Sequence, residues 1–388
     1  MADGRGAAGF VRLRGRPDST GARRLGVSFL STSGRLTAFR NVATLIPAIG
    51  GGYNPLPFAA ASDGRGRMAV AWAETVRDYR RGRVKVAFGT RARGFGQPVT
   101  LARGRGLGGV EAVSVSLGPK RDALVAWSTG SEVLARFLRE KRTVGQAERA
   151  GPTHEGIGIV TALNTRGDAA LAWETRHTGE CGPYAPKVVR VALRPAGRPS
   201  FAASRVQDRG DVRACEALSI RAGLDRRGRV IVGWSRFLQR SGGVTRVVRV
   251  ATGEPGATHL AFYLDLGEGD LGDVALGADG SALVTWDDAF DPLASTDPGP
   301  DNPPLFAVGT VMASIRPRPS SAFTTEAVSA PGSDHQSPVG QFDPHTEAPV
   351  AAWVSRPLVG DPPAPVFQAS RVPLSRRTVA PSADTEGS

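Results

Sequence analysis

The chain has 388 residues, 40% of them hydrophobic, with 49 glycines and 29 prolines. This composition is typical of many short strands joined by turns rather than of long helices or disorder. No apolar run approaches the roughly 18 residues that a membrane helix requires, so we expect no transmembrane segment. The formal charge of +13 would suit nucleic acid, but 45 of the 49 basic residues are arginines spread along the chain. Codon bias explains this as readily as a phosphate-binding surface, so nucleic acid is not the expected partner.

One unit recurs seven times along the chain, a small polar turn followed by an apolar run. The first copy, ADGRGAAGFVR, ends at Arg12. The other six copies end at the six tryptophans of the protein, Trp72, Trp127, Trp173, Trp234, Trp286 and Trp353. Successive copies lie 46 to 67 residues apart, which is too long for a helical solenoid and typical of a repeated β unit.

Each unit contains four short stretches with the character of strands. In one unit they cover residues 111–118 (strand a), 123–127 (strand b), 132–138 (strand c) and 142–148 (strand d). Units of four strands predict an all-β fold, here a seven-bladed β-propeller of four-stranded antiparallel blades. We expect a single domain, 1–380, that acts as a monomer, followed by a disordered tail, 381–388.

The first blade starts at strand b, because too few residues precede it to supply an inner strand. Two explanations stay open. The first blade has three strands, or the natural start lies upstream and supplies both the strand and a signal peptide. The second explanation would place the protein outside the cell or in the cell envelope, although the sequence as given carries no such signal.

The tryptophans end the most apolar strand of each unit, so we expect them to fill the gaps between adjacent sheets rather than to stack on sugars. An Asp-x-x-Gly turn precedes this strand at Asp63 and Asp225. There the aspartate is expected to bond local amides while the glycine adopts a positive φ. The motif resembles the repeat of uncharacterised secreted β-propellers from GC-rich bacteria, a likeness that covers the whole chain. It is neither the WD40 pattern nor the sialidase Asp box, and the resemblance implies no particular chemistry.

A meander of four strands places the a–b and c–d turns at one end of each sheet and the b–c and d–a connections at the other. We call these the turn end and the loop end. Cys181 and Cys215 both belong to the loop end, in adjacent units. We expect them to form a disulfide, which implies an oxidising compartment, and two unpaired thiols are the alternative.

The loop end also carries the acidic segments 265–273 and 287–301. Crowded carboxylates repel one another unless a cation neutralises them, and Ca²⁺ takes six to eight oxygens from such loops. The candidate calcium ligands are Glu268, Asp270, Asp273, Asp287, Asp288 and Asp291. The spacing is not that of an EF-hand, and an acidic loop that only favours solubility is the alternative.

The turn end is rich in basic residues. They are Arg65, Arg91, Arg93, Arg121, Arg139, Lys141, Arg142, Arg166, Arg194, Arg198, Arg226, Arg227, Arg316 and Arg318. Such a surface would suit anionic polymers or lipid headgroups, and a solvated basic face without a ligand is the alternative.

The sequence contains no catalytic motif, and its five histidines fall in different units. We therefore predict a non-catalytic, extracytoplasmic binding or scaffold module whose loop end holds a glycan or a protein partner. One alternative is a glycoside hydrolase that uses Asp270, Asp287 and Asp288 as its carboxylates. A second alternative is a binder of anionic polymers that uses the turn end.

Overall fold

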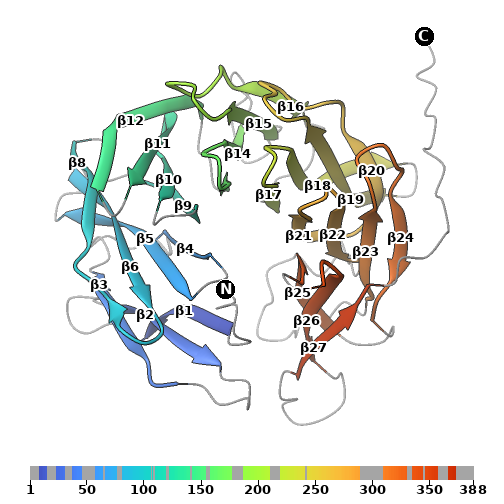
Figure 1. Cartoon of the computed structure of the whole chain (residues 1–388), viewed down its shortest axis with the longest axis horizontal. Coiled ribbons are helices and arrows are strands. Elements are labelled where there is room, and N and C mark those ends of the chain that lie inside the picture. Colours follow the sequence, from blue (N-terminus) through green and yellow to red (C-terminus); the bar gives the residue numbers. More distant parts are fainter. Residues whose placement is uncertain are drawn as a thin grey trace. The chain divides into compact units, whose positions relative to one another are not determined.

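The computed structural model describes residues 8–14, 23–30, 37–45, 57–63, 66–76, 81–105, 107, 110–118, 122–139, 142–153, 158–176, 187–209, 219–240, 243–288, 309–329, 334–343, 346–356 and 366–372. These residues form seven antiparallel sheets, which Figure 1 colours from blue to red along the chain. Within these ranges no helix is long and apolar enough to cross a membrane. The chain divides into two compact units, residues 1–178 with 189–206 (unit 1) and residues 179–188 with 207–388 (unit 2).

Unit 1 begins with a three-stranded sheet, β1 (Ala8–Arg14), β2 (Arg23–Leu30) and β3 (Arg40–Leu45). The second sheet contains β4 (Phe58–Ser62), β5 (Arg67–Val76), β6 (Arg81–Thr90) and β7 (Gly94–Phe95), with β8 (Val99–Arg105) also paired to β6. The third contains β9 (Ala112–Leu117), β10 (Ala123–Ser128), β11 (Glu132–Arg139) and β12 (Arg142–Pro152). The fourth contains β13 (Ile159–Leu163), β14 (Ala169–Arg176), β15 (Lys187–Arg194) and β16 (Arg205–Arg209), and the last two strands have residues in both units.

Unit 2 has the same meander order. Its first sheet contains β17 (Ile220–Leu224), β18 (Val230–Arg240), β19 (Gly243–Gly253) and β20 (Leu264–Glu268). The next contains β21 (Asp270–Leu276), β22 (Ala282–Asp287), β23 (Val311–Arg316) and β24 (Thr324–Ala327). The last contains β25 (Asp334–Phe342), β26 (Pro349–Arg356) and β27 (Val366–Arg371).

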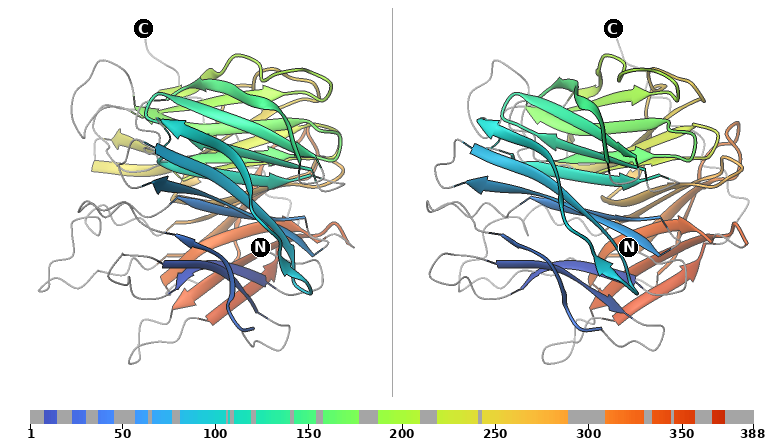
Figure 2. Two further views of the ribbon diagram at one scale, coloured as in Figure 1. Left: turned by 90° about the vertical axis from the view of Figure 1, so that its left-hand side faces the viewer. Right: turned by 60° about the vertical axis from the view of Figure 1, so that its left-hand side comes forward.

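The core of each unit lies between neighbouring sheets. In unit 1 the sheets stack one above the next, from blue to green in Figure 2. The second strand of a sheet is covered on both faces, and β10 and β22 are buried at every residue. Strands in that position read as continuous apolar runs rather than as an alternation of apolar and polar residues. This explains why the second strand of each sheet has the clearest pattern in the sequence.

The tryptophans lie in these interfaces. Five of the six are at most 1% exposed, and Trp353 is 6% exposed. Trp72, Trp127, Trp173, Trp286 and Trp353 each pack in a cluster that includes the preceding sheet. A large ring at this position fills the space between two sheets that a smaller side chain would leave empty.

The Asp-x-x-Gly turns have the predicted chemistry. Asp225 Oδ1 accepts hydrogen bonds of 2.8 Å from the amides of Arg227 and Arg229, and Gly228 has a φ of 91°. Asp63 Oδ1 accepts the amide proton of Arg67 at 3.0 Å. Only a residue without a Cβ adopts such a positive φ without strain, so the predicted role of this glycine is confirmed.

The all-β class and the four-stranded antiparallel sheets are confirmed. The first sheet has three strands, and the second has an additional short strand, β7, because the c–d turn pairs back onto β6 before the chain continues into β8. The predicted tail, 381–388, lies outside the described residues. The seven-bladed ring and the single domain, 1–380, stay predictions.

Candidate functional site

Two arginine-glycine-arginine triplets lie side by side on strands β6 and β8. The antiparallel register pairs Arg81 with Arg105, Gly82 with Gly104 and Arg83 with Arg103. Directly opposed residues on antiparallel strands point to the same face, as do residues two apart on one strand. All four arginines therefore lie on one face of the sheet, as two cross-strand pairs.

A β-bulge produces this register. The pairing shifts between Val84 and Lys85, so that Leu101 on β8 has no residue of β6 opposite it. Without the extra residue, Arg103 would face Gly82 and Arg81 would face Gly104. Shifting the register by one residue moves side chains to the other face, and a bulge is the usual means of re-aiming them.

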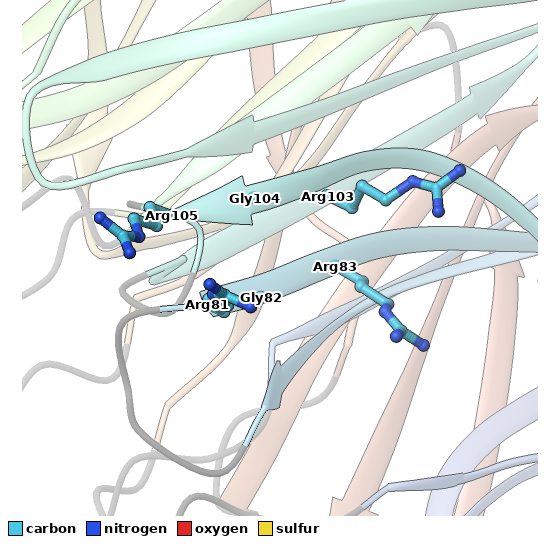
Figure 3. A pocket seen from close by; sticks show the side chains of 6 residues that line it. All are labelled: Arg81, Gly82, Arg83, Arg103, Gly104 and Arg105. Atoms are coloured by element: carbon cyan, nitrogen blue, oxygen red, sulfur yellow. The ribbon is translucent and has the colours of Figure 1, made fainter.

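The six residues of the two triplets line a cavity of about 400 Å³. Figure 3 shows Arg81 and Arg105 together at one end of it, while Arg83 and Arg103 extend toward the other end. All four arginine side chains are exposed. The volume is within the range of ligand-binding pockets, about 300–1,000 Å³. We call this space the arginine cavity, and its four arginines the cavity arginines.

The arginine cavity has no anionic counterpart among the residues that the structure describes. Glu74 lies opposite Arg83 across β5 and β6, but its carboxylate is engaged elsewhere. It accepts hydrogen bonds of 2.9 Å from Trp72 Nε1 and from Lys85 Nζ. No ion pair links the cavity arginines to a carboxylate within the described ranges, and like charges placed directly opposite each other destabilise a sheet. As far as the described residues show, the site is thus a cavity lined by positive charge.

The arginine cavity lies at the loop end of its sheet. It is formed where β6 begins after the b–c connection and where β8 ends before the next inner strand. From the sequence, the basic surface was predicted at the opposite, turn end. Several turn-end arginines are instead used in local contacts. Arg194 lies 4.1 Å from the Phe137 ring centroid and 3.8 Å from Glu148, and Arg166 lies 3.5 Å from Asp168. Arg65, Arg121 and Lys141 lie outside the described residues.

The predicted calcium ligands have other partners where the structure describes them. Asp270 forms a 2.8 Å salt bridge with Arg246 and accepts a 2.7 Å hydrogen bond from Ser235 Oγ. Asp288 accepts the amide proton of Thr310. Over the described part of the chain no group of three or more histidine, cysteine, aspartate or glutamate side chains is placed to hold a metal. Asp291 is not described, and the calcium site stays a prediction.

Asp273 is a predicted calcium ligand with a perturbed pKa. Burial raises its pKa to about 6, against the opposing effects of Arg221 and of hydrogen bonds from the amides of Val274 and Gly340. It follows a bulge at Gly272, where β21 departs from the regular register with β22. The inner strand β21 of unit 2 therefore holds an aspartate whose pKa is raised by burial.

The residues of the hydrolase hypothesis are partly brought together. Asp270 and Asp287 lie opposite each other across β21 and β22. Asp287 is 9% exposed, and the Arg246 contact engages Asp270. A general acid needs access to substrate, which these contacts restrict. The hypothesis stays a prediction, as does the disulfide, because Cys181 and Cys215 lie outside the described residues.

Sequence reasoning missed the arginine cavity, although a signal was present. The triplet Arg-Gly-Arg occurs five times, at 14–16, 65–67, 81–83, 103–105 and 227–229. Of these, the copies at 81–83 and 103–105 lie at the start of the third strand of a sheet, β6, and at the end of β8, which pairs with it. A c strand and the d strand that follows it are antiparallel neighbours, so their loop-end termini meet. Two equal triplets at those termini indicate a cross-strand cluster.

No family model matches the chain, and no curated protein matches it. Solved structures similar to it include a Hadza microbial sialidase, Hz136 (14% identity, 68% of this chain and 57% of that chain, TM-score 0.39). Another is the β-propeller domain of the Trilobed protease from Pyrococcus furiosus (8% identity, 94% of this chain and 92% of that chain, TM-score 0.46). A third is an α-L-arabinanase from Penicillium chrysogenum in complex with arabinobiose (8% identity, 82% of this chain and 93% of that chain, TM-score 0.44). The chain thus spans a little over half the length of the sialidase. Because these TM-scores are below 0.5, we assign the fold from the sheets of this chain and not from these similarities.

Proposed function

We propose that the chain is a non-catalytic binding module that holds an anionic ligand in the arginine cavity. The observation that carries this proposal is the pairing of Arg81 with Arg105 and of Arg83 with Arg103 around a cavity of about 400 Å³. Guanidinium groups bind carboxylate, sulfate and phosphate through paired N–H donors, and clustering them raises the local positive potential. An anion in the cavity would also relieve the repulsion between the opposed arginines.

The ligand-binding surface is still the loop end, as the sequence predicted. The groups that bind the ligand are the four arginines and not the acidic loops. The anionic ligand of the second alternative is retained, but its site moves from the turn end to the loop end. An extracytoplasmic location and a β-propeller ring are part of the proposal as expectations from the sequence.

Calorimetric titration of the full chain with inorganic pyrophosphate, at constant ionic strength, tests this function. The double substitution Arg83→Gln/Arg103→Gln removes one cross-strand pair and should weaken binding about tenfold or more, because each charge-assisted contact is strong. The matched control is Arg93→Gln/Arg139→Gln, which removes two exposed turn-end arginines and the same net charge. It should bind as the unmodified protein does. Equal weakening in both proteins, or weakening in the control alone, would overturn the proposal.

A further inference from the structure

We infer that the ligand of the arginine cavity is a linear acidic polysaccharide, whose carboxylate or sulfate groups occupy two successive subsites. The inference rests on the proposed function and specifies its ligand class. One subsite is the pair Arg81 and Arg105, and the other is the pair Arg83 and Arg103.

The spacing favours two anionic groups over one. Residues two apart on a strand are separated by about 6.6 Å, whereas directly opposed residues have Cβ atoms about 5 Å apart. The two arginines of a pair can therefore share one oxyanion. The other pair lies a strand repeat further along, and Figure 3 shows its side chains extending away from the first pair. A ligand with charges separated along a chain satisfies both pairs, while a compact anion satisfies one.

The lining favours a sugar chain over a nucleic acid. Single-stranded nucleic acids are held by aromatic side chains on which the bases stack, in addition to basic residues. Among the described residues, those that line the cavity are four arginines and two glycines. Gly82 and Gly104 lie opposite each other between the two arginine pairs. Side chains alternate along a strand, so these two positions face the other side of the sheet and place no side chain between the subsites. That leaves room for a sugar ring between two charged groups.

The position of the cavity favours a polymer over a small molecule. Strand β8 pairs with β6 alone among the described strands, so the triplet at 103–105 lies on a sheet edge. Arg105 is the last residue of β8 and Arg81 is the first of β6, so one pair lies at the very end of the sheet. A chain bound across both pairs can continue beyond the sheet at that end. A concave site of this kind fits a single chain better than the flat surface of a lipid bilayer.

The test compares four probes with the full chain at constant ionic strength: inorganic sulfate, an oligogalacturonate, a neutral oligosaccharide and a single-stranded oligonucleotide. Linking two subsites through one ligand should make the oligogalacturonate bind about a hundredfold or more tighter than sulfate. The neutral sugar should not bind, and the oligonucleotide should bind more weakly than the acidic sugar.

The variants Arg81→Gln/Arg105→Gln and Arg83→Gln/Arg103→Gln each remove one subsite. Each should bring the oligogalacturonate close to the affinity of sulfate, while Arg93→Gln/Arg139→Gln leaves it unchanged. If sulfate binds as tightly as the oligogalacturonate and both depend on the arginines, this inference fails and the proposed function stands. If the oligonucleotide binds more tightly, the ligand class is wrong. If no probe depends on the four arginines, both proposals fail.

Discussion

Arg229 donates its Nε proton to Asp225 Oδ2 at 2.6 Å, and the two side chains are 9% and 0% exposed. The same carboxylate accepts the amides of the a–b turn, so one aspartate organises both the turn and a buried guanidinium. That guanidinium lies against Gly280 in the following a–b turn, where an added Cβ would stand 1.9 Å from Arg229 Cζ. The pair therefore ties one turn of unit 2 to the next. Asp63 and Arg67 repeat the arrangement in unit 1, where Arg67 Nη2 donates to the Gly118 carbonyl at 3.1 Å.

The substitution Asp225→Asn should lower the free energy of unfolding by about 3–5 kcal/mol, because it leaves the buried charge of Arg229 uncompensated. Asparagine keeps an Oδ1 acceptor for the turn amides, so the loss would report the charge rather than the turn. Urea denaturation measures it.

Two further proteins separate the charge effect from general damage. Arg226→Gln, at an exposed position in the same turn, should change stability by less than about 0.5 kcal/mol. The double substitution Asp225→Asn/Arg229→Met should be more stable than Asp225→Asn alone, because the uncompensated charge is gone. A single substitution that behaves like Arg226→Gln would contradict the assigned role of the pair.

The indole N–H groups of the tryptophans are not equivalent. Trp234 Nε1 donates to Asp208 Oδ2 at 2.7 Å, and Asp208 also accepts Arg249 Nη1 at 3.1 Å. Trp127 Nε1 is buried and has no hydrogen-bond partner among the described residues. Both rings are 0% exposed, so a change to phenylalanine removes similar apolar area from each.

Trp234→Phe should therefore cost about 1–2 kcal/mol more than Trp127→Phe, because only the first removes a hydrogen bond to a buried carboxylate. Urea denaturation of the two variants, followed by far-UV circular dichroism, measures the difference. Equal losses would show that ring volume alone sets the cost.

The fold was predictable because its signals are local. The apolar second strand, the turn at Asp63 or Asp225 and the alternation of the outer strands each depend on residues close in sequence. The additional strand β7 was not predictable, since Gly89 pairs with Phe95 only after the c–d turn folds back onto β6. Nothing in a six-residue segment distinguishes that pairing from a simple loop.

The site was less predictable, because it depends on a register. The two triplets that form the arginine cavity are separated by 19 residues, and their arginines face each other only because Leu101 forms a bulge. A bulge has no reliable sequence signature, and a shift of one residue would set arginine against glycine. The acidic loops were predicted to bind calcium because of their composition. In the structure, however, Asp270 forms a salt bridge with Arg246, which belongs to a different sheet. Composition does not reveal such contacts between sheets.

Asp273→Asn should raise stability at pH 7. Burial raises the pKa of Asp273 to about 6, well above its ordinary value, so the folded state binds a proton more tightly than the unfolded state does. Ionisation of Asp273 therefore opposes folding. Its unfavourable contribution is absent below about pH 4, grows as the pH rises through 6 and reaches about 2–3 kcal/mol above that.

Thermal unfolding of the unmodified protein and of Asp273→Asn between pH 4 and pH 8 should give curves that meet at the acid end and separate toward neutrality. Asp279→Asn is a control that should change the stability in the opposite direction. There burial, which raises the pKa, is outweighed by the hydrogen bonds from Ser281, a hydrogen bond from the Asp279 amide and the charge of Arg229 together, so the pKa is lowered and this substitution should reduce stability at neutral pH. If Asp273→Asn is the less stable protein at pH 7, the carboxylate is stabilising and the assignment is wrong.

The arginine cavity should make the protein less stable without its ligand. Opposed like charges cost about 0.2–1 kcal/mol per pair, so Arg83→Gln/Arg103→Gln should be slightly more stable than the unmodified protein at low salt. This gain should fade as salt screens the repulsion. An oligogalacturonate should reverse the order, because a ligand that binds only the folded state stabilises it in proportion to occupancy. Thermal unfolding of both proteins, with and without the sugar, follows all three effects. A double variant that is the less stable protein in every condition would show that the four arginines serve the fold rather than a ligand.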